Sequence, residues 1–248
     1  MSRNFEELDF RPTPMGDLIL RRRLMPALDN REVHEVILGD AFLMSDVFTE
    51  VEQAVSTLGL AELDEPGEPG KPGDESWDVV VGGLGLGFTA WKALANPRVA
   101  SMLVVDTMQA VIDWHEQGLV PLGKELCADP RCIFRHGDFF ALAADPATGF
   151  DVEWPGRKFH AIFLDIDHSP RHLLDPSHAV FYSEAGLGKL AEQLHPGGVF
   201  SLWSDDAPDE EFLADLAKVF PNARAEIVSF WNPLRENESE STVYLAKR

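Results

Sequence analysis

From residue 77 onward, short apolar runs alternate with longer segments that have the spacing of amphipathic helices. The strand-like runs cover residues 79–81, 102–105, 133–134, 161–164, 199–203, 227–230 and 243–245, and the helical candidates lie near 88–96, 107–117, 179–194 and 208–219. This alternation predicts an α/β fold with a parallel sheet of seven strands and helices on both faces. Ligands of such sheets bind beyond the carboxyl ends of the strands, so the residues that follow each strand are the candidate site.

The N-terminal segment, residues 1–61, predicts a smaller unit that holds a β-hairpin and a helix. Residues 17–24 and 33–39 are typical of two strands, with Pro26 and the Asp29-Asn30 pair in the turn between them. Ser45 predicts the N-cap of a helix that ends at Gly59. The apolar residues of that helix recur at helical spacing: Val47, Phe48, Val51, Val55 and Leu58.

Residues 62–76 form an acidic segment rich in proline and glycine, which predicts a solvated linker. We therefore expect three parts: the N-terminal extension (1–61), the linker (62–76) and the large α/β domain (77–248). Acidic residues outnumber basic ones by 42 to 21 over the 248 residues, so the formal net charge is −21. That charge argues against nucleic acid and against an anionic membrane surface as partners, and it suits a cationic small molecule.

Two cysteines exclude a disulfide framework and a four-thiolate zinc site. The N-terminus has no apolar leader, and no apolar run reaches the ~18 residues of a membrane-spanning helix. These features predict a protein of the reducing cytoplasm.

A glycine turn directly follows the first strand of the α/β domain. Gly83, Gly85 and Gly87 have the spacing G-x-G-x-G, and Phe88 stands where the dinucleotide fingerprint has its third glycine. Such a turn lets a nucleoside approach the backbone closely, whereas Phe88 disfavours a dinucleotide dehydrogenase.

Acidic residues follow the next strands in turn. Asp106 ends the second strand, where a carboxylate can take both ribose hydroxyls, although it could instead cap the helix at 107–117. Gly137-Asp138 follows the third strand, where the acid can accept a hydrogen bond from an adenine amino group or cap a helix. Asp165 and Asp167 follow the fourth strand and are the candidate catalytic carboxylates.

The order of these motifs resembles the class I fold of methyltransferases that use S-adenosylmethionine (SAM), over residues 77–248. The N-terminal hairpin and the L-x-P-G-G turn from Leu194 to Gly198 most resemble its spermidine synthase branch, whose members move an aminopropyl group from decarboxylated SAM to an amine. The resemblance implies SAM or decarboxylated SAM as the cofactor and pairing of two copies through the hairpin region. Donor-binding residues implied by it are Gly83, Gly85, Gly87, Asp106, Met108, Gly137 and Asp138.

Three departures from the spermidine synthase pattern bear on the reaction. Gly85 stands where that family carries an acid, and residues 48–52 (Phe-Thr-Glu-Val-Glu) replace its Tyr-His-Glu signature. Residues 165–170 replace its Asp-Ser-Thr-Asp-Pro loop. Asp165, Asp167, Glu50 and Glu52 remain as carboxylates that can hold an amine. The missing acid favours methyl transfer to a nitrogen, oxygen or sulfur of a small molecule, and aminopropyl transfer is the alternative.

Other interpretations remain open. The fourth strand's end also resembles that of metal-dependent catechol-type methyltransferases, with Asp205 or Asp206 as a second ligand beside Asp165, but solvated carboxylates are the simpler explanation and we assign no metal. A nucleoside-binding homologue without catalysis is a further alternative. Trp203, which ends the fifth strand, is a candidate wall of the acceptor pocket.

Overall fold

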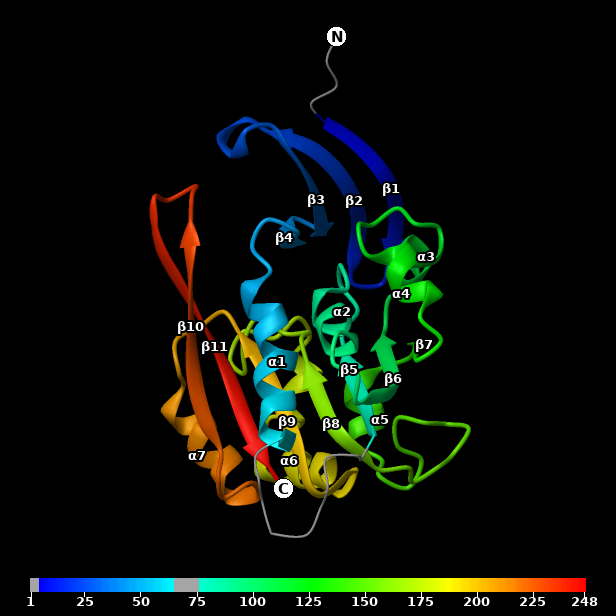
Figure 1. The fold of residues 1–248 in the computed structure, drawn as a ribbon, viewed down its shortest axis with the longest axis vertical. Helices are drawn as coiled ribbons and strands as arrows, with labels where there is room; N and C mark the ends of the chain where they lie inside the picture. The colour runs from blue at the N-terminus through cyan, green and yellow to red at the C-terminus, as the bar shows by residue number, and fades with distance from the viewer. Residues whose placement is uncertain (1–4, 65–75) are drawn as a thin grey trace.

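The computed structural model describes residues 5–64 and 76–248, whose strands form two separate sheets (Figure 1). A small antiparallel sheet from the N-terminal segment lies at one end of the molecule, and a larger mixed sheet with its helices makes up the remainder.

The small sheet has the strand order β1–β2–β3–β4. Its strands are β1 (Phe5–Thr13), β2 (Gly16–Met25), β3 (Arg31–Leu38) and β4 (Ala41–Ser45), and the short 3₁₀ helix η1 (Pro26–Leu28) joins β2 to β3. The predicted hairpin corresponds to β2 and β3, and a further strand flanks it on each side. Ser45 is the last residue of β4 and not a helix cap, because the helix begins only at Glu50, after Val47 and Phe48. The Ser45 Oγ accepts a hydrogen bond from the Val47 N–H in the loop between them.

Helix α1 (Glu50–Asp64) continues five residues beyond Gly59, the position at which the sequence predicts its end. This prediction is wrong because Gly59 lies inside the helix, where it allows close packing against Phe163 of the large sheet. A Cβ on Gly59 would lie 2.5 Å from Cε1 of Phe163, so the missing side chain lets the helix approach the large sheet. Glycine in a helix costs about 1 kcal/mol relative to alanine, which close packing can offset. The linker predicted for residues 62–76 lies mostly outside the described residues.

The large sheet confirms the predicted seven strands and has the order β10–β11–β9–β8–β5–β6–β7. β5, β6, β7, β8 and β9 run parallel, whereas β11 pairs antiparallel with both β9 and β10, so the sheet is mixed and not wholly parallel. The strands are β5 (Trp77–Gly82), β6 (Val99–Asp106), β7 (Cys132–His136), β8 (Phe159–Leu164), β9 (Leu194–Ser204), β10 (Arg224–Asn232) and β11 (Asn237–Lys247).

Helices cover both faces of this sheet because its strand residues alternate between two apolar clusters. Val79 and Val81 pack into the cluster that contains α1, and Val80, between them, packs into the cluster on the opposite face. The helices are α2 (Phe88–Leu94), α3 (Gln109–Glu116), α4 (Gly123–Ala128), α5 (Phe139–Ala143), α6 (Glu184–Glu192), α7 (Glu210–Val219) and the 3₁₀ helix η2 (Pro176–Val180). The sequence missed α4 and α5, which are too short for a periodic pattern.

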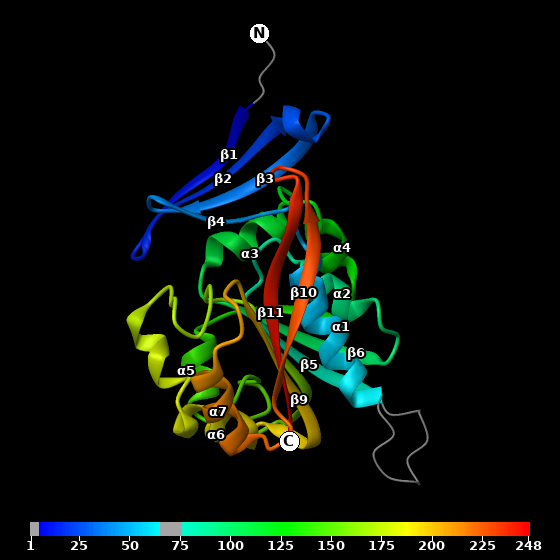
Figure 2. The ribbon, with the colours of Figure 1, turned by 90° about the vertical axis from the view of Figure 1, so that its left-hand side faces the viewer.

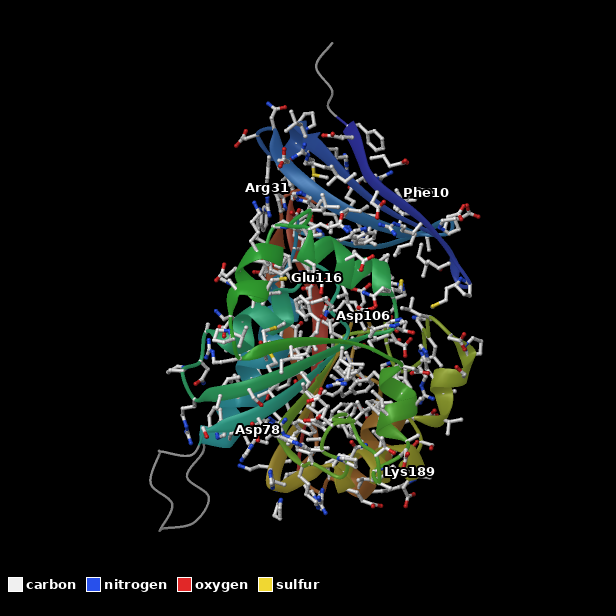
Figure 3. The ribbon with its side chains drawn as sticks, turned by 90° about the vertical axis from the view of Figure 1, so that its right-hand side faces the viewer. Phe10, Arg31, Asp78, Asp106, Glu116 and Lys189 are labelled. Atoms are coloured by element: carbon white, nitrogen blue, oxygen red, sulfur yellow. The ribbon has the colours of Figure 1, made fainter. Side chains whose placement is uncertain are left out.

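The small sheet lies over the edge of the large sheet where the parallel strands end, and the β10–β11 hairpin rises beside it (Figure 2). Figure 3 shows Asp106 at that edge and Asp78 at the opposite one. The buried Trp114 of α3 donates a hydrogen bond of 2.7 Å to Asp9 of β1 and so ties the two parts together. In the described part of the chain, no helix is long and apolar enough to cross a membrane.

Candidate functional site

The glycine turn after β5 packs tightly against the end of β8. Gly83 has a φ of +91°, and a Cβ there would lie 2.0 Å from the carbonyl oxygen of Asp165. The Gly83 N–H donates to the carbonyl of Val105 over 2.9 Å, and the Asp165 N–H donates to that of Gly82 over 2.8 Å. Only glycine fits this position, because a side chain would be both strained and obstructed.

Asp106, at the end of β6, holds the glycine turn from the other side. Its Oδ2 accepts a hydrogen bond from the Leu84 N–H over 2.9 Å, and its Oδ1 accepts one from the Met108 N–H over 2.7 Å. The residue is only 8% exposed, and this burial raises the pKa of its carboxyl group. Oδ2 therefore holds the glycine turn, Oδ1 holds the segment that follows Asp106, and the carboxylate also lines a cavity described below.

His115 of α3 contacts the glycine turn. Sequence analysis did not identify this residue. Its Nε2 lies 3.0 Å from the carbonyl oxygen of Gly85, and its ring is fully buried. Burial lowers the pKa of His115 to about 4, so the ring is neutral at pH 7 and donates its Nε2–H to Gly85.

Asp138 is the N-cap of α5. Its Oδ1 accepts hydrogen bonds from the N–H groups of Phe140 (2.8 Å) and Ala141 (3.1 Å), as the capping interpretation expects. The N–H of Gly137 donates to the carbonyl of Asp106 over 3.0 Å, which places Asp138 beside Asp106. Capping and ligand binding are compatible here, since Asp138 also lines the cavity next to Asp106.

Two adjacent cavities lie between the small sheet and the edge of the large one. The first, the glycine-turn cavity, has a volume of about 190 Å³ and is lined by Met15, Leu43, Met44, Gly83, Gly85, Asp106, Thr107, Met108, Asp138, Phe139, Phe140, Asp165, Ile166, Leu174, Asp175, Ser177 and His178. Of the nine sequence-predicted site residues, it brings together six: Gly83, Gly85, Asp106, Met108, Asp138 and Asp165. Gly87 lines the second cavity, and Gly137 and Asp167 line neither.

The second, the tryptophan cavity, has a volume of about 320 Å³. Aromatic rings from α2, β9, β10 and the loop before α1 form much of its wall: Phe88, Trp203, Phe230 and Phe48. Leu43 and Met44 of β4, with Gly85, Asp165 and Ile166, line both cavities, so the two spaces meet at these residues. The part played by β4 has no signal in the sequence, because its five residues show no motif.

Asp165 stands at the junction of the cavities. Burial raises the pKa of its carboxyl group to about 6, and a hydrogen bond of 2.8 Å from the Thr89 hydroxyl opposes that rise. Glu52 of α1 lines the tryptophan cavity, and burial together with the charge of Asp165 raises its pKa to about 8. Asp205 lines the same cavity. Among the described residues, no lysine or arginine lines either cavity.

Asp167 has a different environment from Asp165. It is 1% exposed, and its carboxylate accepts hydrogen bonds from the Leu174 N–H, the Tyr182 hydroxyl and the His178 ring. These three hydrogen-bond partners belong to the segment that follows β8, and Asp167 lines neither cavity, so we retain Asp165 alone as the candidate catalytic carboxylate. Within residues 5–64 and 76–248, no group of three or more His, Cys, Asp or Glu side chains is arranged to hold a metal ion.

The architecture resembles that of solved structures. A spermidine synthase in complex with the transition-state analogue AdoDATO superposes with a TM-score of 0.69 at 14% sequence identity, over 97% of this chain and 73% of that one. The chain has the fold of spermidine synthase. Spermidine synthase from Thermotoga maritima gives a TM-score of 0.67 at 14% identity, over 97% of this chain and 72% of the other. No protein-family model matches the sequence, and no curated protein matches it either.

The spermidine synthase fold confirms the architecture that the sequence motifs predict, including a β-rich N-terminal unit before the large sheet. At 14% identity the likeness concerns the fold, and the roles of individual residues depend on the geometry of the two cavities.

Proposed function

We propose that this protein transfers an alkyl group from an adenosyl sulfonium donor to an amine. The observation that carries the proposal is the position of Asp165, which lines both cavities where they meet. A donor in the glycine-turn cavity and an acceptor in the tryptophan cavity would face each other across this carboxylate. Such alignment of two reactants accounts for much of the catalysis in transfers of this kind.

The glycine-turn cavity suits the nucleoside end of the donor. Its backbone turn allows close approach, and the carboxylates of Asp106 and Asp138 line its wall together with the apolar Met108 and Phe140. Carboxylates accept hydrogen bonds from hydroxyl and amino groups, which are the groups that ribose and adenine present. The chemistry of this set of residues therefore fits an adenosyl group.

The tryptophan cavity suits a cationic acceptor. Glu52, Asp165 and Asp205 supply negative charge, and the rings of Phe48 and Phe230, 5.5 Å apart, offer faces that attract ammonium groups. Burial raises the pKa values of Glu52 and Asp165, and no lysine or arginine among the described residues of the cavity lining offsets that rise. A bound cation would supply positive charge and favour ionisation of both groups.

The bound sulfonium supplies an electrophilic carbon next to a positively charged sulfur. Asp165 accepts the proton that the amine must lose while its nitrogen lone pair forms the new C–N bond and the electrons of the C–S bond pass to sulfur. Thr89 holds Oδ2 of Asp165 in place, which leaves Oδ1 to face the acceptor. Glu52 and Asp205 hold the cationic end of the acceptor.

The charge of the site favours decarboxylated SAM as the donor. The tail of SAM carries a carboxylate that needs a cationic partner, and the described lining of both cavities contains no lysine or arginine. Aminopropyl transfer is therefore the reaction that this site supports best. Methyl transfer from SAM is the second candidate, favoured by Gly85, which stands where spermidine synthases carry an acid.

The deciding experiment offers purified protein either donor with a panel of monoamines and diamines and detects products by mass spectrometry. We expect an aminopropylated amine from decarboxylated SAM and a loss of at least ~100-fold in kcat for Asp165→Asn. Asp215→Asn, on α7 outside both cavities, serves as the control. A methylated product obtained only with SAM would establish the second candidate, and no product with either donor would refute transferase activity.

A further inference from the structure

The segment after β8 is organised around one buried carboxylate, that of Asp167. It accepts hydrogen bonds from the Leu174 N–H (2.7 Å), Nδ1 of His178 (2.8 Å) and the Tyr182 hydroxyl (2.9 Å). Burial and the neighbouring Asp167 raise the pKa of Tyr182 well above its ordinary value, so the phenol stays protonated. Its O–H donates the hydrogen bond to Asp167. Because a carboxylate only accepts hydrogen bonds, His178 must carry its proton on Nδ1.

His178 is thereby held with its other nitrogen unused. Its ring stacks on that of Phe140, with ring centroids 3.8 Å apart and planes inclined by 24°. Both rings line the glycine-turn cavity. Among the described residues, Nε2 of His178 has no hydrogen-bonding partner. Asp106, by contrast, already uses both of its oxygens for backbone N–H groups.

We propose that His178 is a ligand-binding residue of the glycine-turn cavity, whose Nε2 accepts a hydrogen bond from an N–H or O–H group of the bound nucleoside. Asp167 is its positioning residue: it fixes the tautomer that leaves the Nε2 lone pair available. A fixed acceptor at the wall of a cavity favours a ligand that brings a donor, as adenine and ribose do. This inference rests on the proposed function and extends it to two residues of the segment after β8.

A purely structural role for the Asp167–His178 pair is the competing explanation, and the chain contains a matched control. His34 of β3 and Asp46 form a similar pair, with Nδ1 2.9 Å from Oδ2 and side chains 12% and 8% exposed. This pair lines neither cavity. Its disruption should cost stability in the same way without any effect on a ligand.

The test measures binding of 5′-methylthioadenosine by calorimetry, because this probe carries the nucleoside without a charged tail. We expect His178→Asn, whose amide can still donate to Asp167 but which has no atom at Nε2, to bind about tenfold more weakly than the wild type. His178→Gln, which places a polar atom near Nε2, should recover part of the affinity. Asp167→Asn should also weaken binding, and Asp46→Asn should not.

In turnover assays with an active donor, His178→Asn should raise the KM of the donor and leave the KM of the acceptor unchanged. Wild-type affinity in His178→Asn, or equal losses in Asp167→Asn and Asp46→Asn, would overturn the inference while the proposed function stands. If Asp167→Asn does not fold, the two His178 variants decide the question. A wild-type protein that binds neither this probe nor SAM nor decarboxylated SAM would refute both the inference and the proposed function.

Discussion

The hydroxyl of Thr89, the second residue of α2, lies 2.8 Å from Oδ2 of Asp165 and 3.1 Å from the carbonyl oxygen of Glu52. It therefore connects α1, α2 and the end of β8 at the point where the two cavities meet. Thr89 is 3% exposed, so its hydrogen bond to the carboxylate is protected from water. One buried hydroxyl thus both orients the candidate base and limits the rise in its pKa.

Thr89→Val should impair the reaction and shift its pH dependence. The Thr89 hydrogen bond lowers the pKa of Asp165, so its loss should raise that pKa. The acidic limb of the pH profile of kcat should then move to higher pH. We expect kcat near neutral pH to fall by about tenfold, the value of one hydrogen bond to a charged group. Thr57→Val removes a similar hydroxyl, bonded to the Gln53 carbonyl on exposed α1 surface, and should change neither quantity.

Glu52→Gln should stabilise the protein in alkaline solution. The pKa of Glu52 is raised from 4.5 to about 8 in the folded state, so the folded protein binds more protons than the unfolded chain between these values. Its free energy of unfolding therefore falls as the pH rises through this window. Glutamine removes that dependence, and thermal unfolding at pH 9 should show a Tm higher by at least ~2 °C.

At pH 4.5 the wild type and Glu52→Gln should unfold at nearly equal temperatures, because Glu52 is then mostly protonated in the folded state. The variant should also bind a cationic acceptor more weakly, since a charge in the tryptophan cavity is lost. Equal Tm values at pH 9 would contradict the raised pKa.

Asp138 has two separable roles in the structure, as a helix cap and as a wall of the glycine-turn cavity. Asp138→Ala should lower the free energy of unfolding by about 1 kcal/mol, because the N–H groups of Phe140 and Ala141 lose their acceptor. Asp138→Ser should restore the cap and most of the stability. Calorimetry should show weaker adenosyl binding in both variants; full affinity in Asp138→Ser would remove Asp138 from the donor site.

Gly83→Ala should be much more damaging than a comparable change elsewhere. Gly83 and Gly197 both have positive φ values, +91° and +79°, so alanine is strained at either position. A Cβ at Gly83 would also lie 2.0 Å from the Asp165 carbonyl oxygen, whereas nothing lies within 4 Å of one at Gly197. Denaturant unfolding should show a loss of about 1 kcal/mol for Gly197→Ala and at least ~2 kcal/mol more for Gly83→Ala. Similar losses of unfolding free energy in both variants would show that the glycine turn can shift to make room for a Cβ at Gly83.

Local patterns predicted most of the large sheet. Its strands are short apolar runs with a glycine turn or an acid at their ends, and both signals arise from residues near one another in the chain. The N-terminal unit was harder to predict: β1 mixes charged residues with a few apolar ones, so its strand pattern is weak. At Gly59 a local rule failed because the nearest atoms belong to Phe163, far away in the chain.

The sequence by itself determined the acidic character of the chain, the order of the motifs, the glycine turn after β5 and the carboxylates at the ends of β6, β7, β8 and β9. Strand periodicity and turns depend on local backbone chemistry, so these features can be read from neighbouring residues. Only the tertiary structure decided which carboxylates meet. It placed Glu52 beside Asp165, turned Asp167 into the buried partner of His178, and covered both cavities with β4. The physical reason is that a site is made by side chains from elements far apart in sequence, whose distances are set by how helices and sheets pack.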